Sequence, residues 1–239
     1  MNSPKRLARI GGVLYLLLAI FGGFAQGYLY PKIYVAGDAG KTAANLIANS
    51  GLVRAGVVSD LFQATVWVFL AIVLYRLLRH VNKDVAGVMA VLATIGAGIT
   101  MLNSLFEFEA LRVATGAVNM ATLGATGSTA MIQLLVDAQH YGLMIASIFM
   151  GLWLAPLGYL AYRSGMFPRP LGVVLVGACA AYLVDVLAAF LVPDIARSIH
   201  GYLSILPSIA EPAICLYLLI KGVRTVNTAP AQRPVLAAA

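Results

Sequence analysis

The segment Met131–Ala161 reads MIQLLVDAQHYGLMIASIFMGLWLAPLGYLA, and Asp137 and His140 are its only acidic or basic residues. An α-helix needs about 20 apolar residues to cross the hydrocarbon core of a bilayer. The segment is long enough for this, and it lacks the apolar–polar alternation of a membrane β-strand. It therefore predicts a transmembrane helix, which tilts or projects from the bilayer because it exceeds the required length.

Five further segments meet the same test, so the sequence predicts an all-α membrane bundle of six transmembrane helices. The six segments are Ile10–Leu29, Leu52–Leu77, Val85–Phe108, Met131–Ala161, Leu171–Val192 and Gly201–Ile220. The composition agrees, because 61% of the 239 residues are hydrophobic and only 10% are charged, whereas soluble domains carry roughly 25% charged residues. Soluble enzymes, disordered chains and secreted disulfide scaffolds are thereby excluded.

The basic residues predict the orientation of the bundle. Although the net charge is +7, the cations lie at helix ends and not in one patch, so nucleic acid is not an expected partner. Eleven of the sixteen Lys and Arg residues fall on the side of the two termini. Because cytoplasmic loops are enriched in Lys and Arg, both termini are expected in the cytoplasm and the helices in a bacterial inner membrane. Residues Pro31–Gly51 and Thr115–Ala130 are expected to be long external loops.

The chain is expected to form one membrane domain over residues 1–226, followed by a short disordered cytoplasmic tail over residues 227–239. The basic start Lys5–Arg9, followed by an apolar run and the trio Gly23-Phe24-Ala25, also fits a cleaved signal peptide. Cleavage there leaves five helices. Cys179 and Cys215 lie inside apolar runs and are interpreted as small packing residues.

Polar residues are concentrated in the predicted outer halves of the helices, where charged side chains are costly and therefore candidates for function. The candidate ligand-binding residues are Gln26, Arg54, Asp60, Glu107, Asp137, His140, Asp185 and Glu211. Five of them are carboxylates, and the only basic residues in the set are Arg54 and the titratable His140. Buried carboxylates in excess are protonated, hydrated or bound to something positive. This pattern predicts an outward-opening acidic cavity that binds or transports a small cationic or proton-coupled ligand.

Depth and helical spacing sharpen this hypothesis. Five residues lie at a similar predicted depth in the membrane: Asp60, Asp137, His140, Asp185 and Glu211. At least three of these five are predicted to line a single connected cavity. On the last helix, one face is shared by Ser204, Ser208, Glu211 and Cys215. Pro207 and Pro212 flank the acid and each removes a backbone donor. Transporters build ion and substrate sites at such interruptions.

Two alternatives remain open. The spacing Asp137-x-x-His140 is similar to the carboxylate-x-x-His pairs of metal sites in helical bundles. A membrane enzyme that uses His140 and neighbouring carboxylates as acid, base or metal ligands is therefore a second hypothesis. In a third, Arg54 pairs with Asp60 and Asp137 with His140 only to hold helices together, as in a scaffolding subunit. No P-loop, GxSxG, HExxH, CxxC or Rossmann motif occurs, so no cofactor is expected.

Several motifs resemble one bacterial family, catalogued as domain of unknown function four-three-eight-six. They are Arg9–Leu16, Ala36–Ala39, Arg54–Leu61, Asp137–Gly142 and, above all, Pro156–Arg169 (PLGYLAYRSGMFPR). The resemblance extends from about Leu7 to Gly222. It implies a six-helix bacterial membrane protein and no particular activity.

Overall fold

A computed structural model describes residues 3–224, and every regular element within them is a helix. The elements are α1 (Pro4–Gly22), the π-helix η1 (Gly23–Leu29), α2 (Tyr30–Ile33), α3 (Ala39–Ala48), α4 (Ser50–Leu78), α5 (Lys83–Ala114), the 3₁₀-helix η2 (Ala121–Leu123), α6 (Gly124–Leu152), α7 (Leu154–Ser164), α8 (Arg169–Leu191), α9 (Pro193–Leu203), α10 (Ile205–Leu216) and the π-helix η3 (Tyr217–Lys221).

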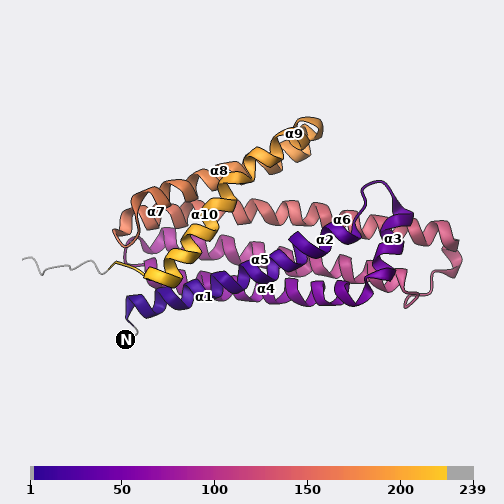
Figure 1. Ribbon diagram of the computed structural model, residues 1–239, viewed down its shortest axis with the longest axis horizontal. Helices are drawn as coiled ribbons and strands as arrows, with labels where there is room; N and C mark the ends of the chain where they lie inside the picture. The colour runs from indigo at the N-terminus through magenta and orange to yellow at the C-terminus, as the bar shows by residue number, and fades with distance from the viewer. Residues whose placement is uncertain (1–2, 225–239) are drawn as a thin grey trace, which may run out of the picture.

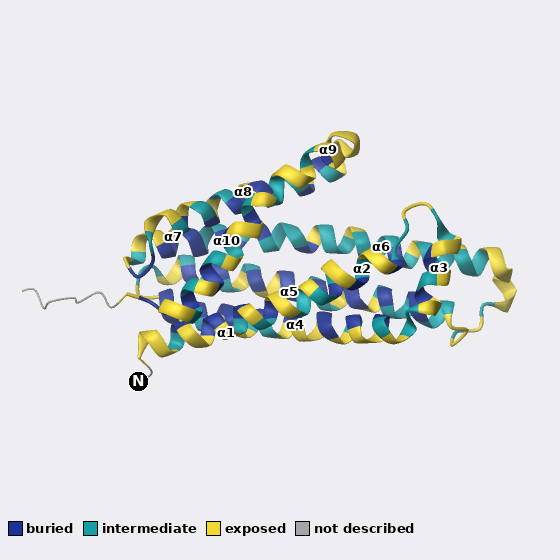
Figure 2. Ribbon diagram, in the orientation of Figure 1, coloured by how far each residue is buried: buried dark blue, intermediate teal, exposed yellow. Residues whose placement is uncertain are grey.

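Apart from α3, these elements join end to end into six helices long and apolar enough to cross a membrane, which confirms the predicted bundle. They are Pro4–Ile33, Ser50–Leu78, Lys83–Ala114, Ala121–Ser164, Arg169–Leu191 and Pro193–Lys221. Exposed residues follow the outer faces of the helices and buried residues the interior (Figure 2). Many exposed side chains are large and apolar, such as Phe62, Leu102 and Val173, which suits contact with lipid chains. The proposed tail, residues 227–239, lies outside the described residues.

The long helices α1, α4, α5 and α6 run side by side along the molecule (Figure 1). At one end lie the N-terminus, the turn between α4 and α5, and the turn between α7 and α8; we call this the terminal end. At the opposite, far end lie α3, η2 and the link between α5 and α6. The hairpin of α8 and α9 diverges from the other helices toward the far end, and α10 returns to the bundle (Figure 1).

Prolines explain two helix breaks. Pro207 cannot donate to the carbonyl of Leu203, and the last span breaks there into α9 and α10, as the sequence predicts. Pro156 likewise cannot donate to the carbonyl of Leu152, where the fourth span breaks into α6 and α7. This fourth span, 44 residues long, projects at the far end, in agreement with its predicted excess length.

The expectation of two long external loops is wrong in part. Residues Gly124–Ala130 already belong to α6, and α5 continues to Ala114. The other segment contains the helix α3, whose start is fixed by Asp38: its Oδ1 accepts a hydrogen bond from the backbone N–H of Lys41 at 2.9 Å. This bond and the Lys41 side chain lower the pKa of the Asp38 carboxyl. An Asp cap before an alanine-rich run is a sequence signal for a helix that the loop interpretation missed.

Two apolar cores are separated by a polar layer. The terminal-end core includes Trp67, Leu74 and Trp153, and the far-end core is smaller, formed by Leu29, Ile33, Leu46, Val53, Ala110, Leu111, Ile132 and Val136. The buried polar residues between them are Ser59, Asp60 and Gln63 on α4, Thr100, Asn103, Ser104 and Glu107 on α5, and Gln139 on α6. We call these eight residues the polar layer. Polar side chains enter the bundle because lipid cannot satisfy them.

Candidate functional site

A cavity of about 760 Å³ lies beside the polar layer, lined by side chains from α1, η1, α4, α6, α8, α9 and α10. Its volume falls within the roughly 300–1,000 Å³ typical of small-molecule sites. The predicted polar face of the last helix lines it in full, with Ser204, Ser208, Glu211 and Cys215. The divergence of α8 and α9 from the bundle leaves room for this cavity.

Glu211 is the central acidic group of the cavity. Tyr15 donates a hydrogen bond to its Oε2 at 3.1 Å, and Tyr182 donates one to its Oε1 at 2.9 Å. The carboxylate is thereby held by helices α1 and α8 from opposite sides of α10. In the described part of the chain, no Lys or Arg lines the cavity, and both side-chain hydrogen bonds to Glu211 come from phenols.

The far-end portion of the cavity contains a contact between a histidine and a carboxylate. His200 Nδ1 lies 2.8 Å from Asp185 Oδ2, and the side chains are 67% and 23% exposed, respectively. Both residues line the cavity. Asp185 lies 15 residues before His200, on the preceding helix, so the sequence alone gives no signal of this contact.

Aromatic rings form much of the cavity wall. The Trp67 and Trp153 rings meet edge to face with centroids 5.7 Å apart, and the Tyr15 and Trp153 centroids are 5.8 Å apart. Two buried polar atoms of this wall, Gln63 Oε1 and Trp67 Nε1, have no hydrogen-bond partner among residues 3–224. A buried polar atom without a partner is costly, so these atoms are suited to contact a ligand or water.

Asp60 lies behind the cavity and not in it. Only 1% of Asp60 is exposed, and Gln26 Nε2 donates to its two carboxylate oxygens at 3.1 and 3.2 Å. Gln26 itself lines the cavity, so its amide separates the cavity from the carboxylate. The predicted pairing with Arg54 is wrong: this arginine is exposed, and within residues 3–224 it forms no salt bridge.

Asp137 and His140 form a separate cluster with aromatic residues. Asp137 Oδ1 accepts hydrogen bonds from Tyr34 Oη and Gln133 Nε2, both at 2.9 Å, instead of pairing with His140. The histidine ring stacks on Tyr30 and Tyr34, with centroids 5.9 and 5.2 Å apart. Burial, and then the hydrogen bond to Asp137, raise the pKa of Tyr34 to about 12, so this phenol remains a neutral donor.

The prediction of one shared cavity is therefore wrong in its stated form. Of the five residues expected in one layer, the cavity contains two, Asp185 and Glu211. Glu107 also lies away from it, in the polar layer. A common depth does not determine the direction in which each helix points its side chains. The hypothesis of a metal site at His140 with neighbouring carboxylates finds no geometric basis either: among residues 3–224, no group of three His, Cys, Asp or Glu side chains could hold a metal ion.

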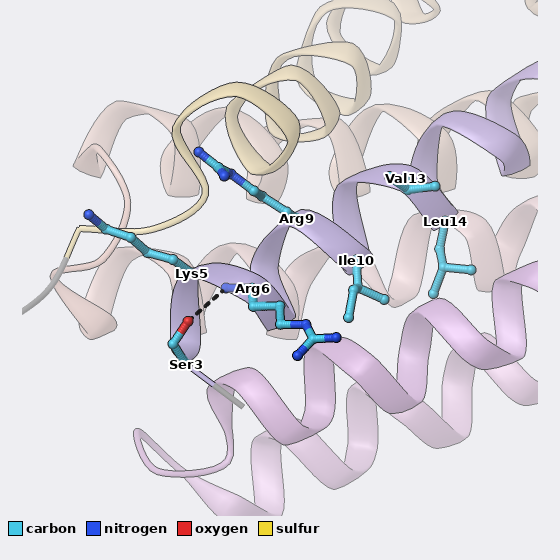
Figure 3. A pocket seen from close by; sticks show the side chains of 7 residues that line it. All are labelled: Ser3, Lys5, Arg6, Arg9, Ile10, Val13 and Leu14. Atoms are coloured by element: carbon cyan, nitrogen blue, oxygen red, sulfur yellow. Dashed lines mark hydrogen bonds between the residues drawn. The ribbon is translucent and has the colours of Figure 1, made fainter. Parts of the chain in front are cut away.

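A second hollow, of about 420 Å³, lies on one face of α1 at the terminal end. Lys5, Arg6 and Arg9 extend outward from the first turns, beside Ile10 and Val13 (Figure 3). Ser3 caps this helix by accepting a hydrogen bond from the backbone of Arg6. Cations next to an apolar helix face are typical of a helix end in the headgroup region.

Sequence reasoning missed Tyr15, Tyr182 and Trp153, although all three line the cavity. Their signal is weak, because aromatic residues in apolar runs are usually part of the core. A hydroxyl at membrane depth needs a hydrogen-bond partner, and this requirement marks Tyr15 and Tyr182 as candidates for contact with a buried acid.

Comparison with known proteins identifies the family of the chain. An uncharacterized protein of Archaeoglobus fulgidus is 28% identical over 159 residues, which are 65% of this chain and 76% of that protein. No solved structure matches the chain. Residues 10–222, nearly the whole described bundle, match the family described as a domain of unknown function, DUF4386. The chain, with its six helices able to span a membrane, therefore belongs to the DUF4386 family.

Proposed function

We propose that this protein binds a small organic cation in the cavity, as the substrate site of a membrane transporter. One observation carries the proposal: Glu211 is held by two phenols and, within residues 3–224, has no basic partner, whereas the second carboxylate of the cavity, Asp185, contacts His200. Charges at membrane depth are costly unless they are paired. A bound cation supplies the missing partner.

The wall explains why the cation is organic. Tryptophan and tyrosine faces attract cations through their quadrupole, most strongly in desolvated sites, and aromatic cages are used to bind quaternary ammonium groups. Tyr15, Trp67 and Trp153 place such rings around the cavity.

Tryptophan fluorescence tests this proposal directly, because both tryptophans of the chain, Trp67 and Trp153, line the cavity. The probes are choline and its neutral isostere 3,3-dimethylbutan-1-ol, added to the purified full-length protein. Choline is expected to change the emission saturably and to bind at least about tenfold more tightly than the alcohol, since only choline gains charge and cation–π interactions. Equal responses, or no response to choline, contradict the proposal.

The orientation belongs to the same proposal: the terminal end faces the cytoplasm of a bacterial inner membrane, and the cavity is reached from outside. The cluster of Lys5, Arg6 and Arg9 at the terminal end supports it. Fusions of a fluorescent protein after Lys83 and at the C-terminus are expected to fluoresce. Alkaline phosphatase, which is active only outside, is expected to be active after Gly116 and inactive after Lys83. An external signal after Lys83 contradicts this topology.

A further inference from the structure

The polar layer contains two carboxylates buried side by side. Asp60 is 1% exposed and Glu107 is 3% exposed. A Cβ atom at Gly56 would lie 3.5 Å from Glu107 Oε1, so the glutamate reaches α4 one helical turn from Asp60, on the same face.

These two acids have only neutral partners. Asp60 accepts from the Gln26 amide, and Glu107 Oε2 accepts a long hydrogen bond of 3.5 Å from Gln139 Nε2. No Lys, Arg or His among residues 3–224 forms a salt bridge with either carboxylate. Two anions buried without a positive charge are strongly destabilising.

Two oxygen atoms of this cluster, Glu107 Oε1 and Gln139 Oε1, are buried and unpartnered within the described residues. Gln139 is 1% exposed, and its backbone carbonyl accepts a hydrogen bond from Asn103 Nδ2 at 2.6 Å. Its side-chain amide donates to Glu107 and keeps a free acceptor. Hard metal cations prefer oxygen ligands of this kind, carboxylate and amide carbonyl.

We infer that Asp60, Glu107 and Gln139 form a site for one monovalent metal cation, Na⁺. A single cation satisfies both unpartnered oxygens at once, whereas a proton satisfies one. The adjacent π-helix η1, which carries Gln26, departs from regular α-helical structure, and π segments are frequent at functional sites. Transporters place coupling ions beside such irregular helices at membrane depth.

The ion site stands without the proposed function, because none of its three residues lines the cavity. Gln26 connects the two sites: its side chain lines the cavity and its amide donates to Asp60. An ion bound to Asp60 competes with the hydrogen bond from the Gln26 amide and thereby changes the position of Gln26 in the cavity wall.

Thermal unfolding of the purified full-length protein tests the inference, with NaCl compared against N-methylglucamine chloride at equal ionic strength. At an excess of about 100-fold over its Kd, Na⁺ is expected to raise the Tm by roughly 5 °C or more. Glu107→Gln is expected to lose this shift and to keep, without Na⁺, a Tm at or above that of the wild type, since the amide removes a buried charge. The matched control is Glu109→Gln, which changes the same residue type on the same helix. Glu109 is partly exposed and pairs with Arg112. This variant is expected to retain the shift.

Two further variants keep the test decisive. Asp60→Asn is expected to lose the Na⁺-induced shift in Tm as well. This variant therefore tests the site even if Glu107→Gln does not fold. N-methylglucamine is itself an organic cation with hydroxyl groups and, under the proposed function, a candidate ligand of the cavity. The two salts are therefore also compared in Glu211→Gln, which lacks the cavity carboxylate and is expected to retain the Na⁺ shift, so the two proposals can fail separately. The inference is overturned if Glu211→Gln has the same Tm in both salts, if Glu107→Gln and Asp60→Asn still respond to Na⁺, or if Ca²⁺ stabilises the protein more than Na⁺ does.

Discussion

Glu211→Gln is expected to weaken choline binding by about 100-fold, because it removes the charge that the cavity presents to a cation. Removing one partner of a buried, hydrogen-bonded charge pair costs about 2–5 kcal/mol, and a 100-fold change corresponds to about 2.7 kcal/mol. The glutamine keeps the length of the side chain and can still accept from Tyr15 or Tyr182 through its carbonyl oxygen. The change therefore tests charge with little change in shape. Titration of tryptophan emission with choline measures the effect.

A matched control for this variant is Asp194→Asn. Asp194 lies on α9 of the same span, forms an exposed pair with Arg197 and does not line the cavity. Its neutralisation is expected to leave choline affinity unchanged. A similar loss of affinity in both variants would indicate a general effect of the net charge of the protein. An unchanged affinity in Glu211→Gln would show that this carboxylate is not part of the binding site.

Gly172→Ala is expected to lower the Tm of the purified protein by roughly 5–10 °C, because it adds a methyl group where two helix backbones touch. A Cβ at Gly172 would lie 2.6 Å from the carbonyl oxygen of Gly158, and a Cβ at Gly158 would lie 2.6 Å from the carbonyl oxygen of Gly172. Neither atom belongs to a flexible side chain, so α7 and α8 must separate. Such overpacking costs about 1–3 kcal/mol or more, and 1 kcal/mol corresponds to roughly 2–4 °C in a chain of this size.

The control for this substitution is Gly98→Ala on α5. Gly98 is exposed, and a Cβ there meets nothing within 4 Å. Because Ala has a higher helix propensity than Gly, the Tm is expected to stay the same or to rise slightly. The close contact between α7 and α8 is contradicted if Gly172→Ala is as stable as Gly98→Ala.

The amino-acid sequence alone determined the six membrane helices and the polar face of α10, because both depend on local properties. Hydropathy over about 20 residues is sufficient to predict a span, and the helical period places Ser204, Ser208 and Glu211 on one face in any bundle. The last span breaks at the carbonyl that Pro207 leaves without a donor, whereas Pro212 lies within α10 and does not end it. By contrast, Pro156 breaks the fourth span, where the sequence analysis expected one continuous helix.

Only the tertiary structure decided which polar groups meet. Sequence position gives the depth of a residue in the membrane, and by depth alone Asp60, Asp137 and Glu211 belong to one site. The rotation and crossing angle of each helix are set by packing between distant segments, such as Gly158 against Gly172. These contacts turn Asp60 toward Gln26, Asp137 toward Tyr34 and Glu211 toward Tyr15 and Tyr182. One predicted layer is thereby divided into three separate environments, and the cavity is left with the acids of α8 and α10.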